Sequence, residues 1–267
     1  GLGDGLRKPL LELNRARDLK AKWRAITHID PKQLVRLPQN SEPRTKLSMG
    51  EHQAITALAW QIERSAQDEL AYHSHQNLAR AYAEGFFADL ITPFYGLEKD
   101  DNLRADTTLD KLGKLKAVFG KKNSNPTMTA GNSTPLTDGA SAVLLANDDW
   151  AKARGFAPLA YITHQQTAAV DFVGKNGVAE GLLMAPAYAV PKMLARAGLS
   201  LQDFDFYEIH EAFASQVLAT LKAWEDETFC REKLGLETAL GKIDRSKLNV
   251  NGSSCLLYTS DAADERS

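Results

Sequence analysis

Residues 207–214 constrain the chain most, because two kinds of structure meet there. Residues 204–209 are typical of a short β-strand, and apolar residues then recur at helical spacing from Ala214 to Trp224. In α/β sheets ligands bind outside the carboxyl ends of strands, where helix N-termini present unpaired N–H groups. His210 and Glu211, at this junction, are therefore candidates for a functional site. The same pattern fits equally a packed helix cap in which Glu211 complements the helix dipole.

The composition limits the class of protein. Of 267 residues, 43% are hydrophobic and 25% are charged, which is typical of a globular chain with one large or two medium domains. The net charge of -2 does not indicate a nucleic-acid-binding surface. Two cysteines are too few for a disulfide framework and are typical of a reducing cytoplasm. Because no apolar run approaches the ~20 residues that span a bilayer, we do not expect an integral membrane protein.

The remaining sequence predicts helices first and an α/β pattern afterwards. Residues 50–87 predict two helices, and small residues recur on one face of the second, which indicates close packing. Residues 96–126 predict a long loop that contains a short helix. Further on, the pattern predicts a buried strand at residues 141–146, a second strand at 159–163 and a helix at 190–197.

Two histidines of the second predicted helix, His73 and His75, resemble a pair of metal ligands. Residues at positions i and i+2 of a helix point to different sides, so joint binding of a metal ion is disfavoured. We therefore expect both histidines to face solvent, and we predict no metal site.

Several segments, taken together and in order, resemble the thiolase family. Residues 47–50 resemble the Met-Gly segment beside the acyl pocket, and residues 67–76 resemble the helix that follows it. Residues 129–140 are similar to the Ala-Gly-Asn segment, and residues 249–252 to the segment that leads into a Gly-His-Pro loop. Residues 210–214, His-Glu-Ala-Phe-Ala, lie where most thiolases have Asn-Glu-Ala-Phe-Ala. The histidine is typical of the branch that serves as the β subunit of the fatty-acid oxidation complex.

The resemblance implies an α/β thiolase fold, with layers in the order αβαβα, duplicated halves and an inserted, mainly helical loop domain. Only part of this fold is expected here. Residues 1–128 would form the loop domain over the active site with the end of the first-half connection. Residues 129–156 would be the last part of the N-terminal half, and residues 157–254 the start of the C-terminal half.

The resemblance also implies that three catalytic groups of the family are absent. The nucleophilic cysteine would precede Gly1, and the Gly-His-Pro histidine and the acid/base cysteine would follow Ser254. From Cys255 onwards the sequence resembles a translated sequencing adapter, so we expect residues 255–267 to be non-native. The chain is therefore expected to be a fragment that is inactive by itself.

As implied by the resemblance, the parent protein is an acetyl-CoA C-acyltransferase that cleaves 3-ketoacyl-CoA thiolytically in β-oxidation, or runs the reverse condensation. His210 would hydrogen-bond the enolate oxygen, and Glu211 would support it. A neutral imidazole is expected because the positive end of the following helix disfavours imidazolium. The residues expected to bind acyl-CoA or CoA are Met49, Lys116, Ala130, Thr134 and Phe213.

The same resemblance implies no permanently bound cofactor, with coenzyme A as co-substrate. A homodimer or higher oligomer is expected of the full-length protein, with a hydratase/dehydrogenase α subunit as a further partner. The alternative is a non-catalytic thiolase-like carrier of lipid or acyl-CoA. That carrier would lack either the nucleophilic cysteine or the Gly-His-Pro motif.

Overall fold

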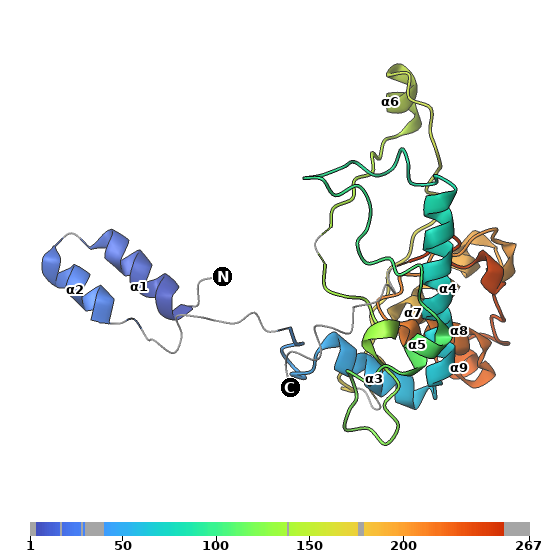
Figure 1. The fold of residues 1–267 in the computed structure, drawn as a ribbon, viewed down its shortest axis with the longest axis horizontal. Helices are drawn as coiled ribbons and strands as arrows, with labels where there is room; N and C mark the ends of the chain where they lie inside the picture. Colours follow the sequence, from blue (N-terminus) through green and yellow to red (C-terminus); the bar gives the residue numbers. More distant parts are fainter. Residues whose placement is uncertain are drawn as a thin grey trace. The chain divides into compact units, whose positions relative to one another are not determined.

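The computed structural model describes residues 4–16, 18–27, 29, 40–137, 139–175 and 179–253. The chain divides into two compact units, residues 1–46 and residues 47–267 (Figure 1). In the first unit, helices α1 (Asp4–Arg15) and α2 (Leu19–Thr27) pack against each other. The Asp18 carboxylate accepts a hydrogen bond of 2.7 Å from the Ala21 N–H and so caps the start of α2.

The regular secondary structure in the described part of the second unit is helical. None of the helices in the described part of the chain is both long and apolar enough to cross a bilayer. The α-helices of this unit are α3 (Met49–Ala59), α4 (Arg64–Ala83), α5 (Leu109–Gly113), α6 (Asp148–Ala153), α7 (Ala185–Ala197), α8 (Ala214–Glu225) and α9 (Glu227–Glu232). The 3-10 helices are η2 (Ala130–Asn132), η3 (Leu201–Asp203) and η4 (Arg245–Lys247).

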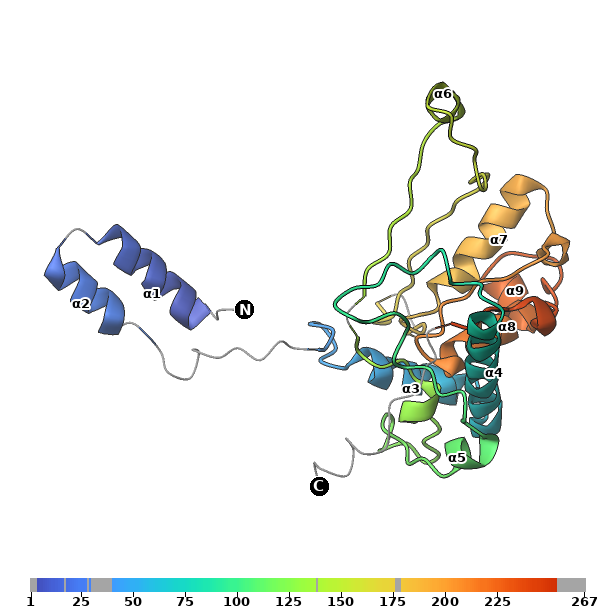
Figure 2. The same cartoon turned by 45° about the horizontal axis from the view of Figure 1, so that its top comes forward.

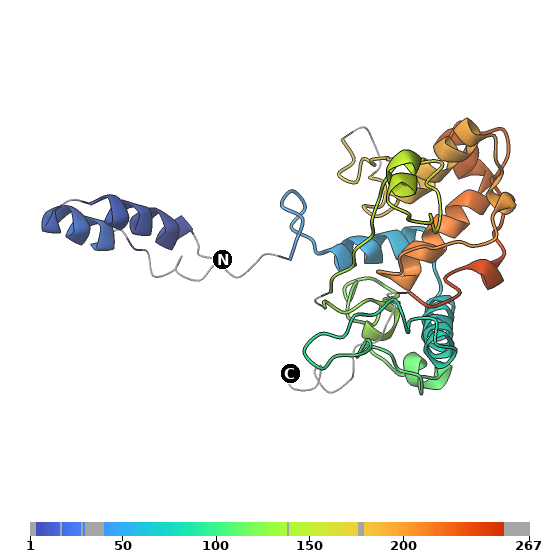
Figure 3. The same ribbon diagram turned by 90° about the horizontal axis from the view of Figure 1, so that it is seen from above.

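Helix α8 lies at the centre of this unit. Almost all of its residues are buried, which requires packing partners on every side. Helices α3, α4, α7 and α9 supply these partners (Figure 2). Helix α4, upright in Figure 1 and seen nearly end-on in Figure 3, contacts both α8 and the η2 turn. The predicted helix that begins at Ala214 is therefore confirmed, and it is the scaffold on which the preceding segment rests.

Two apolar clusters hold α8 in place. On one side Ala54 and Ala57 of α3 pack with Ala219. On the other side Leu194 of α7 packs with Leu221, both about 3% exposed. A fully buried leucine contributes roughly 1.5–3 kcal/mol, and alanines at the α3 contact allow the two helices to approach closely.

The predicted strands are not formed in the described residues. Pairing between extended segments is limited there to isolated β-bridges. Of the strand predicted at 204–209, only Tyr207 pairs in the described residues, through a parallel bridge to Leu248. The segments at 141–146 and 159–163 run extended on either side of α6 (Figure 2). Val143 is 81% exposed, so the prediction of a buried strand at 141–146 is wrong for this structure, and the strand predicted at 159–163 is not formed either, with Leu159 102% exposed. A strand needs neighbouring strands for its N–H and C=O groups, and the described residues provide none at these segments.

The two histidines of α4 differ in their surroundings. His73 keeps 63% of its side chain exposed, as expected, whereas His75 is completely buried. The expectation that both face solvent is wrong for His75, because one of the two sides of α4 faces the protein interior. The Nδ1 atom of His75 accepts a hydrogen bond of 3.2 Å from the Arg104 N–H, and the buried ring thereby ties the 100–107 segment to α4.

The burial of His75 makes the stability of the protein depend on pH. The pKa of His75 is lowered from 6.5 to about 4, mainly by desolvation and to a smaller extent by the Arg104 guanidinium, while the Asp106 carboxylate opposes this shift. Below pH 6.5 the unfolded chain binds a proton that the folded protein does not take up until about pH 4. We expect the free energy of unfolding to fall by up to about 3 kcal/mol as the pH is lowered from 6.5 to 4, and urea titrations at several pH values measure this change. His75→Gln should lose this pH dependence and His73→Gln should keep it; identical pH curves for wild type and His75→Gln would contradict the assignment.

Candidate active site

His210 lies on a short connection between the Tyr207–Leu248 bridge and α8. Phe213 is the N-cap residue of α8, so residues 211–213 separate His210 from the helix. His210 thus lies at the predicted junction, on the connection that leads into α8. The predicted influence of the helix dipole on the imidazole stays a prediction. The side chain of His210 is exposed, which leaves it accessible to a substrate.

Glu211 points the opposite way, into the protein. It is 2% exposed, and its Oε1 atom accepts a hydrogen bond of 2.6 Å from the Asn249 side-chain amide. Its own N–H donates to the Ser253 hydroxyl over 3.3 Å. Glu211 thus holds backbone and side-chain groups together beneath His210, which fits the supporting role predicted for it.

The segment that contains Ala130 and Thr134 lies against the His210 connection. Ser133 forms an antiparallel bridge with Phe213, and the Thr134 N–H donates to the Ala212 carbonyl over 2.8 Å. Ala130 opens the η2 turn and is partly exposed, as is Thr134. Two stretches that are far apart in sequence, and that were both predicted as site segments, are therefore joined by backbone hydrogen bonds.

A buried polar network fixes the η2 turn to α4. Asp68 Oδ1 accepts a hydrogen bond of 2.9 Å from the Asn132 amide, and its Oδ2 receives the Arg64 Nε–H at 2.7 Å. Arg64 also donates through Nη2 to the carbonyls of Leu112 and Leu115, over 2.7 and 3.1 Å. One carboxylate thereby connects three parts of the chain on which the site segment rests.

The Met49 segment reaches the site through Phe119. The Ser48 hydroxyl caps α3, and a Cβ atom added at Gly50 would lie 2.3 Å from the Phe119 ring, so the glycine permits this close approach. The rings of Phe119 and Phe213 meet edge to face with 5.9 Å between their centroids. Phe213 is 7% exposed and belongs to the core, so packing accounts for it directly. Met49 keeps 50% of its surface exposed.

Lys116 is exposed and immediately precedes Ala117, whose backbone forms a bridge with Thr129. This bridge places the start of the η2 turn, and with it Ala130, beside the Lys116 segment. The described site residues thus come from four stretches of chain that meet around the N-terminal end of α8.

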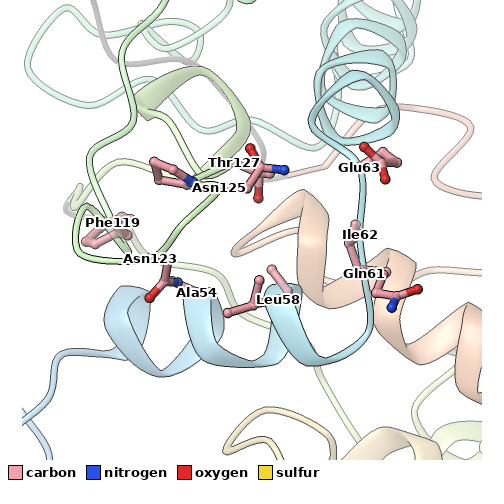
Figure 4. A pocket seen from close by; sticks show the side chains of 11 residues that line it. Ala54, Leu58, Gln61, Ile62, Glu63, Phe119, Asn123, Asn125 and Thr127 are labelled. Carbon is pink, nitrogen blue, oxygen red and sulfur yellow. The ribbon is translucent and has the colours of Figure 1, made fainter.

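Two cavities flank these stretches. The first, of about 190 Å³, lies between α3 and the loop 119–127, where Ala54 and Leu58 face Phe119 and Thr127 (Figure 4). The second, of about 320 Å³, is lined by Thr134 together with Gly252 and Ser253. Of the predicted site residues, Thr134 lines the second cavity.

The chain was compared with known proteins. Residues 18–149 match the family model described as "Thiolase, N-terminal domain", and residues 156–257 match "Thiolase, C-terminal domain". The chain belongs to the thiolase family. The domain boundaries predicted at 128 and 156 stay predictions.

Curated thiolases resemble this chain along most of its length. The 3-ketoacyl-CoA thiolase of Pseudoalteromonas atlantica is 41% identical over 261 residues, which is 95% of this chain and 58% of that protein. The 3-ketoacyl-CoA thiolase of Pectobacterium atrosepticum is 39% identical over the same shares. This thiolase chain therefore spans 58% of the length of the curated relatives that it matches.

Solved thiolase structures share the fold. The acetyl-CoA acetyltransferase of Bacillus anthracis superposes with a TM-score of 0.64 at 33% identity, covering 82% of this chain and 51% of that one. Human mitochondrial 3-ketoacyl-CoA thiolase gives a TM-score of 0.65 at 32% identity, covering 82% of this chain and 50% of that one. The same human protein has also been solved in complex with CoA. These neighbours confirm the predicted thiolase fold, of which this chain carries a part.

The nucleophilic cysteine, the Gly-His-Pro histidine and the acid/base cysteine of the family are not seen among the described residues. Residues 254–267, with Cys255, lie outside the described residues, as does Asp138 of the 129–140 segment. Among the described residues the cysteine is Cys230, completely buried with its thiol 3.4 Å from the Ala223 carbonyl, so this thiol is not at the site. No group of three or more potential ligands in the described ranges is placed to hold a metal ion.

Two residues that contribute to the site carry no local signal in the sequence. Phe119 ends a short predicted helix without a periodic pattern, and its role becomes visible only where it meets Gly50 and Phe213. Asn249 belongs to the recognised 249–252 segment, but nothing nearby in sequence indicates that its side chain reaches Glu211.

Proposed function

We propose that the thiolase to which this chain belongs is an acetyl-CoA C-acyltransferase that cleaves 3-ketoacyl-CoA, or runs the reverse condensation. In the cleavage direction a cysteine thiolate forms a bond to the 3-keto carbon, and the bond between C2 and C3 breaks. Acetyl-CoA leaves as an enolate that takes up a proton. The CoA thiol then attacks the thioester on the enzyme, which releases the shortened acyl-CoA and restores the cysteine.

One observation carries this proposal for the described residues. The exposed His210 directly follows the partly buried Ile209, and two residues later the Ala212 carbonyl accepts the Thr134 N–H over 2.8 Å. A hydrogen-bond donor therefore lies beside the segment that resembles the family's CoA-binding stretch. Each step of thiolysis builds negative charge on a carbonyl oxygen, and a fixed donor at such an oxygen is worth roughly 2.7–4 kcal/mol.

We assign the roles accordingly. His210 donates, directly or through a water molecule, to the enolate oxygen, and Glu211 fixes the backbone around it. The remaining predicted site residues bind the acyl chain or CoA: Met49 along the acyl channel, Phe213 at the wall near the thioester, Ala130 and Thr134 at the pantetheine arm, and Lys116 near the nucleotide. The partly exposed Ala130 and Thr134 and the exposed Lys116 are accessible to such a ligand.

Coenzyme A is in this proposal a co-substrate, with no cofactor bound permanently. The two cysteines of the chain favour a reducing cytoplasm as the compartment. Assembly into a homodimer or larger oligomer, and with a hydratase/dehydrogenase α subunit, follows from the resemblance to the oxidation-complex branch. The names of the relatives, 3-ketoacyl-CoA thiolase, support the reaction class.

The test compares the full-length protein with this 267-residue chain. Both are incubated with a 3-ketoacyl-CoA and free CoA, and acetyl-CoA is followed by chromatography. We expect acetyl-CoA from the full-length protein and none from the chain, because the attacking thiolate lies outside it. Binding of acyl-CoA by the full-length protein without any cleavage would instead identify a carrier, and cleavage by the chain alone would contradict the account of its missing groups.

A further inference from the structure

Asn249 has an unusual position, directly after η4 (Arg245–Lys247) and Leu248. Its backbone adopts the left-handed conformation with φ of 46°, which asparagine tolerates better than most residues. The side chain is 2% exposed. A buried amide at such a position needs hydrogen-bond partners, because an unpaired amide in the protein interior is costly.

The amide of Asn249 finds its partners on both sides of His210. Its Oδ1 accepts the Ile209 N–H over 2.8 Å, and its Nδ2 donates to the Ile209 carbonyl, also over 2.8 Å. The same Nδ2 donates to Glu211 Oε1 over 2.6 Å. The residues before and after His210 are therefore held by one side chain, while the imidazole itself stays exposed.

Helix α4 in turn holds the segment that carries Asn249. The Asn77 amide donates to the Asn249 carbonyl over 3.1 Å, and the Ser253 N–H donates to the Ser74 hydroxyl over 3.0 Å. Gly252 lies so close to α4 that an added Cβ would be 2.8 Å from the Ser74 carbonyl oxygen. Helix α4 thus helps to hold Asn249 in place, together with the hydrogen bond of 2.8 Å that the Asn249 N–H donates to the Tyr207 carbonyl.

We propose that Asn249 is the positioning residue of His210. Its amide orients the His210 backbone so that the imidazole is presented to the enolate oxygen, and α4 holds the Asn249 segment through Asn77 and Ser74. The inference rests on the function proposed above for His210. Misplacement of a catalytic group by about 1 Å is enough to slow a reaction about 100-fold.

Asn249→Gly in the full-length thiolase is the first test. Glycine accepts the left-handed backbone, so this variant removes the side-chain hydrogen bonds with little change in the chain path. We expect kcat for thiolysis to fall at least about tenfold while KM for CoA changes less than about twofold. The decisive measurement is the same substitution in a His210→Ala background, where no further loss of kcat is expected because Asn249 acts through His210.

Asn249→Asp tests the hydrogen bond to Glu211 separately. Two facing carboxylates must share a proton, which raises the pKa of the pair. The ratio of the variant's kcat to the wild-type kcat should therefore be highest at low pH, where the shared proton is bound. This ratio should fall as the pH rises through the raised pKa. Adding Glu211→Gln restores a donor and should recover part of the activity at high pH. Asn147→Asp, an exposed N-cap where Asp serves as well as Asn, is the control for the added charge.

The outcomes separate the two proposals. If His210→Ala leaves kcat unchanged, the function proposed for His210 fails, whatever Asn249 does. If His210→Ala slows thiolysis but Asn249→Gly lowers kcat by the same factor in the wild-type and His210→Ala backgrounds, Asn249 is merely structural. The positioning role is then overturned. A pH-independent loss in Asn249→Asp without rescue by Glu211→Gln would overturn it as well. Thermal unfolding of each variant shows whether the loss belongs to the folded enzyme.

Discussion

Replacing His210 by alanine is expected to lower the rate of thiolysis by the full-length protein at least tenfold, with little change in CoA affinity. The reason is that an enolate oxygen carries most of its charge in the transition state, and a donor aimed at it stabilises the transition state more than the bound substrate. The exposed imidazole lies beside a partly buried, hydrogen-bonded backbone, so its removal should leave the fold intact. Steady-state kinetics and a CoA binding titration measure the two quantities.

Two further variants sharpen this prediction. His210→Asn keeps an N–H donor of the kind found at this place in most thiolases, and it should retain much more activity than His210→Ala. His73→Ala removes an exposed imidazole from the surface of α4 and should leave turnover unchanged. Wild-type turnover in His210→Ala would contradict the role of His210 as the donor to the enolate.

Replacing Asp68 by alanine is expected to lower the free energy of unfolding by about 3 kcal/mol. Removing one partner of a buried ion pair leaves the other charge without compensation, which typically costs ~3–5 kcal/mol. The side chain of Asp68 is 6% exposed and that of Arg64 is 26% exposed, so solvent relieves part of the loss on the arginine. The Asn132 amide also loses its partner, which should loosen the η2 turn.

The neighbouring Glu69 provides a matched control for Asp68. Its side chain is 62% exposed and lies 4.0 Å from His73, an arrangement that contributes little. Glu69→Ala removes the same charge from the same helix and should change the free energy of unfolding by no more than about 0.5 kcal/mol. Equal effects of the two substitutions in urea titrations would show that the network around Asp68 does not stabilise the fold.

Much of the helical scaffold could be predicted from the sequence. The apolar spacing after Ala214 predicts α8, and the small residues on α4 predict close helix packing, which the structure shows where Ala71 packs with Ala214 of α8. The thiolase family could also be recognised from five short segments. The strands could not be predicted correctly in the same way, because an apolar extended segment such as 141–146 becomes a strand only when another strand pairs with it.

The sequence alone thus determined the helices α3, α4, α7 and α8 and the family to which the chain belongs, because periodicity and capping act between residues that are close along the chain. It did not determine which polar groups meet. The Asn249 amide reaches Ile209 across 40 positions, and the Asn132 amide reaches Asp68 across 64. Such hydrogen bonds depend on the packing of whole helices, as does the burial of His75 on the inner side of α4. Only the tertiary structure could place His210 on a connection held by both α8 and α4.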